Sequence, residues 1–223
     1  MTPLDRLLPF DRDGALAETF TRLQLLRGTA AVLGGAAVGA ALAAGSASAA
    51  SAAGDIAILD YALTLEELQA AFYSEAEHAG ALDGALARQA TVVGAHERAH
   101  VVALRRVLGG HASARPAFDF RGVTERPEQF RETAVAFEDL AVAVYKHEAP
   151  RIASREYLAA AIAIHSVEAR HAAWIRRLAG ILPAAHAFDE PLARARAMEL
   201  VSSTGFIVAR ARTEGRSAPR FTG

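Results

Sequence analysis

The chain has 223 residues, a formal net charge of −1 and a hydrophobic content of 52 %. A nearly neutral chain has no strongly basic surface to attract nucleic acid, which excludes that class of partner. Cysteine is absent, so thiol nucleophiles, disulfides, iron–sulfur clusters and cysteine-bound zinc are excluded as well. Any metal site must use histidine and carboxylate ligands, which suit iron, manganese or zinc. Alanine-rich stretches favour an all-α fold.

Residues 1–49 show the order of segments that is typical of a secretory signal peptide. A charged segment ends at Arg27, an apolar Gly/Ala-rich run follows over about 29–44, and Ala-Ser-Ala at 47–49 fits a cleavage site. The long charged segment resembles a twin-arginine (Tat) signal in which Leu23 replaces the second arginine. A Sec signal or an uncleaved anchor helix are the alternatives, but the run is too weakly hydrophobic to predict a membrane span. We expect export to the periplasm, the cell envelope or the extracellular space.

Four helices of similar length are expected between residues 55 and 180. Periodicity and punctuation place them at about 55–79, with Asp55 as the N-cap, and at 84–108, 127–149 and 154–180. Connections of about four residues make each successive pair an antiparallel hairpin, whereas about 17 residues (110–126) separate the two pairs. About 11 extended residues span such a helix, so this connection can cross the bundle. Residues 55–182 are therefore predicted to form a ferritin-like antiparallel four-helix bundle with one long crossover.

The same helical hairpin occurs twice in the chain. With an offset of 72 residues the first helix matches the third, and with an offset of 71 the second matches the fourth. Each half offers one Glu on its first helix and a Glu-x-x-His on its second. These six residues are Glu66, Glu97, His100, Glu138, Glu168 and His171. Glu and His three positions apart lie about 60° from each other on a helix, so both can face one ion.

The helical phase of Glu66 points to the bundle interior, because Leu59, Leu63 and Tyr73 share its face. Burying several carboxylates without compensation costs several kcal/mol for each charge. Two divalent cations would offset four negative charges. We therefore predict two metal ions on the six residues, with iron as the first choice and manganese as the second.

Three further residues are expected near the predicted ligands. Tyr73 and Tyr145 each follow a predicted ligand by seven residues, and His165 precedes Glu168 by three. They could contact the ligands, and packing in the core is the alternative for each.

The segment His96-Glu97-Arg-Ala-His100 also matches the His-Glu-x-x-His signature of zinc peptidases. In that alternative His96 and His100 bind zinc and Glu97 is the general base. It leaves the other predicted ligands unexplained, and Val167 stands in place of His96 in the repeat. The dinuclear site is therefore the preferred hypothesis.

The chain resembles exported bacterial ferritin-like domain proteins, which are related to plant desiccation-related proteins. The matching segments are Asp-Ile-Ala-Ile-Leu-Asp-Tyr-Ala-Leu-Thr-Leu-Glu at 55–66, Ala-Phe-Tyr at 71–73, Phe-Glu-Asp at 137–139 with Tyr145, and 188–192 leading to 205–207. The resemblance covers about 55–208. It implies that Glu97 and Glu168 bridge the two metals, that Glu66 and His100 complete one site, and that Glu138 and His171 complete the other.

Such a site implies redox chemistry with dioxygen or peroxide, in stress protection or metal handling. An enzyme of this kind would be a di-iron or di-manganese oxidoreductase of the ferroxidase, peroxidase or catalase type. The alternative is a non-enzymatic, stress-protective scaffold without bound metal. Residues 183–208 are expected to pack on the bundle with a short helix at about 190–203, and 209–223 to form a disordered tail. The chain could also form an oligomer.

Overall fold

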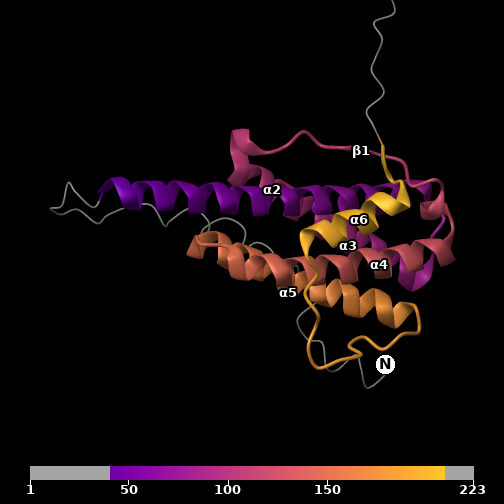
Figure 1. Ribbon diagram of the computed structural model, residues 1–223. Helices are drawn as coiled ribbons and strands as arrows, with labels where there is room; N and C mark the ends of the chain where they lie inside the picture. Colours follow the sequence, from indigo (N-terminus) through magenta and orange to yellow (C-terminus); the bar gives the residue numbers. More distant parts are fainter. Residues whose placement is uncertain (1–40, 209–223) are drawn as a thin grey trace, which may run out of the picture.

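The computed structural model describes residues 41–208, with side chains from residue 52 onward. Four long helices form an antiparallel bundle (Figure 1). They are α2 (Ala41–Ala79), α3 (Gly84–Leu108), α4 (Pro127–Glu148) and α5 (Arg155–Leu178). α2 packs along α3, and α4 packs along α5. The predicted all-α, ferritin-like bundle is confirmed.

Glycine, proline and serine mark the helix ends. Gly80 follows α2 with a φ of +63°, and Gly109 follows α3 with a φ of +53°. This left-handed region strains residues that carry a Cβ. Pro127 is the first residue of α4, where its missing N–H has no helical partner to lose. The Ser154 hydroxyl accepts a hydrogen bond from the Tyr157 backbone N–H at 3.3 Å and so caps α5.

The first helix begins earlier than predicted, and the prediction that Asp55 is its N-cap is wrong. α2 runs without a break from Ala41, because the alanine-rich residues 41–53 have high helix propensity. The buried Asp55 carboxylate instead accepts hydrogen bonds from the backbone N–H groups of Ala153 and Ser154, at 2.8 Å each. These donors immediately precede α5, so a side chain from α2 binds the N-terminal end of another helix beside its N-cap Ser154.

The crossover and the C-terminal segment meet in a two-stranded sheet that the sequence did not predict. The crossover contains η2 (Gly109–His111), β1 (Ala117–Phe118) and η3 (Val123–Glu125), and η4 (Ala149–Arg151) precedes α5. After α5, the chain forms α6 (Arg194–Thr204), which lies against α4, and β2 (Ile207–Val208). β1 pairs antiparallel with β2. α6 begins four residues later than the predicted short helix.

Most of the predicted export signal and the whole predicted tail lie outside the described residues. Within 41–208, none of the helices combines the length and the hydrophobicity needed to cross a bilayer. Export therefore stays a prediction.

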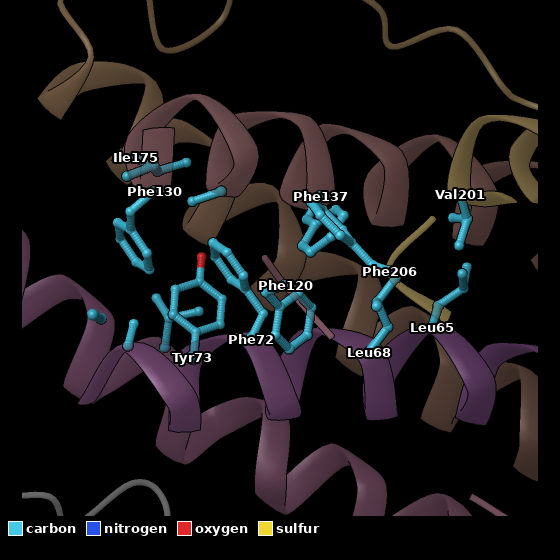
Figure 2. Close-up of a cluster of buried hydrophobic side chains, with 14 of the residues drawn as sticks. Leu65, Leu68, Phe72, Tyr73, Phe120, Phe130, Phe137, Ile175, Val201 and Phe206 are labelled. Carbon is cyan, nitrogen blue, oxygen red and sulfur yellow. The ribbon is translucent and has the colours of Figure 1, made fainter. Parts of the chain in front are cut away.

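An aromatic-rich cluster packs along α2 and α4 and takes in residues of α3, α5 and the C-terminal segment (Figure 2). Phe72 is fully buried at its centre, with ring centroids 5.0 Å from Phe130, 5.1 Å from Phe137 and 5.4 Å from Phe120. Phe206, just before β2, packs edge-on against Phe120. The C-terminal segment therefore contributes to the core of the bundle rather than merely covering it.

A second, largely aliphatic cluster joins the early part of α2 with the last turns of α3 and the first half of α5. Its buried members are Ile58, Leu59, Ala62, Leu63, Leu104, Leu108, Tyr145, Ile152, Ala161 and Ile164. On α3, the last buried residue of the aromatic cluster is Val93 and the first of the aliphatic cluster is Leu104. On α5 the order is reversed: the last buried aliphatic residue is Ile164, and Ile175 belongs to the aromatic cluster. The two Glu-x-x-His segments fall between these positions. On α3 and α5 they therefore form a polar layer between the two apolar clusters.

Candidate metal centre

The structure brings all six predicted ligands together in this polar layer. Their ligand atoms form two groups, and within each group every ligand atom lies within 4.8 Å of the others. The first group is Glu66, Glu97, His100 and Glu168, and the second is Glu97, Glu138, Glu168 and His171. The four glutamates are at most 1 % exposed. One Glu comes from α2, one from α4, and a Glu-x-x-His from each of α3 and α5, as the repeat predicts.

The Nδ1 atom of each histidine faces three carboxylates. His100 Nδ1 lies 3.1 Å from Glu66 Oε2, 3.1 Å from Glu168 Oε1 and 3.6 Å from Glu97 Oε2. His171 Nδ1 lies 3.0 Å from Glu97 Oε1, 3.5 Å from Glu138 Oε2 and 3.7 Å from Glu168 Oε2. Glu97 and Glu168 thus each turn one carboxylate oxygen towards His100 and the other towards His171.

The donor set fits a pair of metal ions. Among the described residues, both carboxylate oxygens of Glu97 and Glu168, Oε2 of Glu138 and Nδ1 of His171 are buried and have no well-aligned hydrogen bond, although they lie close to one another. Buried polar atoms normally have well-aligned hydrogen bonds, so a cluster of atoms without them fits the ligands of a bound ion. Two ligand atoms that each lie about 2.1 Å from one ion are about 3.0–3.4 Å apart. Most of the observed separations fall close to this range.

Residues 54–180 match the family model of the ferritin-like domain. The chain belongs to this family. The match contains all six converging residues and both hairpins of the repeat. It does not distinguish an exported or desiccation-related branch. No protein with a curated description matches the chain.

In the metal-free ferritin-like domain, protons compensate the buried carboxylates. Burial lowers the pKa of His171, but the nearby Glu138, Glu168 and Glu97 outweigh it and raise this pKa to about 12. The pKa of His100 is raised in the same way, by Glu66 and then Glu168. Both imidazoles are therefore charged at neutral pH.

Two of the glutamates hold protons more tightly than an exposed glutamate does. Burial, followed by repulsion from Glu168 and Glu66, raises the pKa of Glu97 well above its ordinary value. Burial also raises the pKa of Glu138 to about 7, although His171 beside it acts in the opposite direction. A cation that enters the centre must displace these protons.

The two tyrosines form crossed hydrogen bonds at the centre of the ferritin-like domain. Tyr73 on α2 donates to Glu138 Oε1 on α4 at 2.5 Å, and Tyr145 on α4 donates to Glu66 Oε1 on α2 at 2.6 Å. Each phenol therefore holds the glutamate of the opposite helix and leaves that residue's other oxygen to face a histidine. Gln89 on α3 also approaches the Tyr73 hydroxyl, at 3.5 Å.

The remaining histidines of the sequence analysis divide into two cases. His165 is half-buried, belongs to neither metal group, and has no hydrogen-bond partner for its buried Nε2 among the described residues. His96 also belongs to neither group, which does not support the zinc-peptidase hypothesis. Its Nδ1 instead lies 2.9 Å from Nε2 of His171. Sequence reasoning missed this contact, although His96 shares a helix face with His100, four residues later.

Proposed function

We propose that this ferritin-like protein binds two metal ions, iron or manganese, and uses them in redox chemistry with dioxygen or peroxide. The observation that carries the proposal is the sharing of Glu97 and Glu168 between two groups of ligand atoms. A single mononuclear site would not need two histidines that face the same pair of carboxylates from opposite sides. We propose that this redox chemistry serves stress protection or metal handling in the cell envelope or outside the cell.

The six residues have defined places in this proposal. Glu66 and His100 would hold one ion, Glu138 and His171 the other, with Glu97 and Glu168 as bridges. The four glutamates among these ligands supply four negative charges, which two divalent cations balance. When bound, such a metal pair supplies or accepts the electrons that dioxygen or peroxide chemistry requires.

The protein contributes orientation and exclusion of water. The carboxylates are almost completely buried, so electrostatic interactions within the centre are stronger than they would be in water. The phenol groups of Tyr73 and Tyr145 keep one oxygen of Glu138 and Glu66 engaged. That restraint reduces the conformational freedom that the ligands would otherwise lose on binding an ion.

A metal-free, stress-protective scaffold is the rival, and one observation favours it. His100 and His171 gain protons readily beside the carboxylates, so ion pairs compensate part of the buried charge without any metal. Such a bundle could serve as a stable scaffold or bind a partner. Metal content and turnover distinguish the two functions.

The deciding experiment is elemental analysis of the purified chain beside a Glu97→Ala/Glu168→Ala variant. The matched control is Glu190→Ala/Glu199→Ala, which removes two exposed glutamates. We expect two iron or manganese ions per chain in the parent and control and none in the first variant, with consumption of dioxygen or peroxide only by the loaded proteins. A parent that binds no stoichiometric metal, while the variant folds as well as or better than it, would refute the metal function and favour the scaffold.

Export rests on the pattern of residues 1–49 and needs its own experiment. We propose that these residues direct secretion and are removed near residues 47–49. Mass spectrometry of the protein from a secreting host would show a mature N-terminus close to residue 50. An intact N-terminus in the cytoplasmic fraction would contradict export.

A further inference from the structure

An exposed histidine lies against one of the two buried histidines of the centre. His96 is exposed on α3, whereas His171 on α5 is only 3 % exposed. Their rings are nearly parallel, with centroids 5.2 Å apart and an interplanar angle of 16°, and His96 Nδ1 lies 2.9 Å from His171 Nε2. The contact joins residues that are 75 positions apart in the chain.

The chemistry of imidazole assigns a direction to this hydrogen bond. His171 turns Nδ1 towards three carboxylates, and a metal ion at that position needs the lone pair of Nδ1. A neutral imidazole carries one N–H, so the proton of a metal-bound His171 is on Nε2. The acceptor within reach of that proton is Nδ1 of His96. Histidine ligands commonly donate their second N–H to a neighbouring acceptor, which fixes the ring and its tautomer.

The internal repeat gives the other histidine no equivalent partner. The offset of 71 residues that relates His100 to His171 places Val167 on α5 in the position that corresponds to His96 on α3. A valine side chain cannot accept a hydrogen bond. The two halves of the centre therefore have matching ligands, but only one has a histidine at the position of His96.

We propose that His96 is a positioning residue for the His171 half of the centre and makes that half the tighter of two unequal metal sites. The inference rests on the proposed metal function and adds an order of binding to it. An ion on the His171 side meets a ring that the contact with His96 already orients, and the proton that stays on Nε2 when the ion displaces the Nδ1 proton faces His96. On the His100 side, the position that corresponds to His96 holds Val167, which cannot accept a proton from the ring.

The test is a titration of the metal-free full chain with Mn²⁺, in which calorimetry and electron paramagnetic resonance measure the binding. The parent should bind two ions with different dissociation constants. His96→Val, which copies the residue of the other half, should weaken the tighter ion about 10–100-fold, in line with the effect of removing a hydrogen-bond partner from a ligand histidine. His96→Asn should largely restore the affinity, because its side-chain oxygen can accept the same proton. His111→Val, at an exposed histidine of η2, is the matched control and should change neither constant.

Two backgrounds assign the effect to one half. With His100→Ala, which leaves the His171 half intact, His96→Val should still weaken the remaining ion. With His171→Ala, His96→Val should have no effect. Unchanged constants in His96→Val, equal weakening of both ions together with a lower unfolding temperature, or a persistent effect in the His171→Ala background would overturn the inference. A parent chain that binds no Mn²⁺ or iron would instead refute the proposed function, and the inference with it.

Discussion

Replacing Tyr73 by Phe removes one hydroxyl from the interior and leaves the aromatic ring in place. The lost hydroxyl donates to Glu138 Oε1 at 2.5 Å in a fully buried setting. A hydrogen bond to a charged acceptor contributes about 1.5–3 kcal/mol, and stranding a buried acceptor has a cost in the same range. Gln89 loses a neighbour as well. We expect the free energy of unfolding of the metal-free chain to fall by about 2–3 kcal/mol.

The assay is chemical and thermal unfolding of the metal-free chain at pH 8, above the pKa of about 7 of Glu138, so that this carboxylate is charged. For a chain of this size the expected loss corresponds to a melting temperature lower by about 4–12 °C. Tyr145→Phe, which removes the donor to Glu66, should have a similar but slightly smaller effect, because Tyr145 lacks, among the described residues, a second hydrogen-bonding neighbour of the kind that Gln89 is to Tyr73.

Tyr61→Phe is the matched control. Tyr61 is also buried on α2, but its hydroxyl has no hydrogen-bond partner among the described residues. Its removal should leave stability unchanged or raise it slightly, because an unsatisfied buried hydroxyl is unfavourable. A loss below about 0.5 kcal/mol for Tyr73→Phe, or an equal loss for Tyr61→Phe, would refute the argument that the crossed hydrogen bonds stabilise the centre.

Three further predictions concern stability. Asp55→Ala, which removes the acceptor of two backbone N–H groups just before α5, should lower the free energy of unfolding by about 2–4 kcal/mol in urea denaturation. Gly94→Ala should lower it by about 1–3 kcal/mol, because a Cβ there would lie 2.9 Å from Tyr73 Cβ and force α2 and α3 apart. The metal-free chain should lose stability from pH 5 to pH 8 in thermal unfolding, because Glu138 and His171 have folded-state pKa values of about 7 and about 12, above the ordinary 4.5 and 6.5. The folded chain then binds more protons than the unfolded chain, and stability falls as pH rises.

Each of these predictions has its own control. Asp60→Ala, at an aspartate of the same helix whose partner Ser113 is exposed, should have a smaller effect than Asp55→Ala. Gly54→Ala, where an added Cβ meets open space, should stabilise its helix by about 0.5–1 kcal/mol, opposite in sign to Gly94→Ala. Saturating Mn²⁺ should weaken or reverse the fall with pH, since the metal competes with protons. The same sign at both glycines, or a stability that rises with pH without metal, would contradict the argument.

The helices and the six converging residues could be predicted because their signals are local or duplicated. A Glu and a His three positions apart share a helix face whatever surrounds them. The occurrence of this pattern twice, each time with a partner Glu such as Glu66, indicated a common centre. The start of α2 was predicted wrongly, because Asp55 has the residue type of an N-cap and only the packing of α5 beside it shows which helix end it binds.

The sequence by itself determined the helical repeat, the positions of most helix ends and the residues that face the interior. The tertiary structure alone decided which groups meet across the bundle: Tyr73 with Glu138, His96 with His171, and β1 with β2. The physical reason is the difference in range. Periodicity and capping depend on neighbours within a few residues, whereas these contacts depend on how each helix is rotated and shifted against another. That arrangement follows from the packing of the whole core.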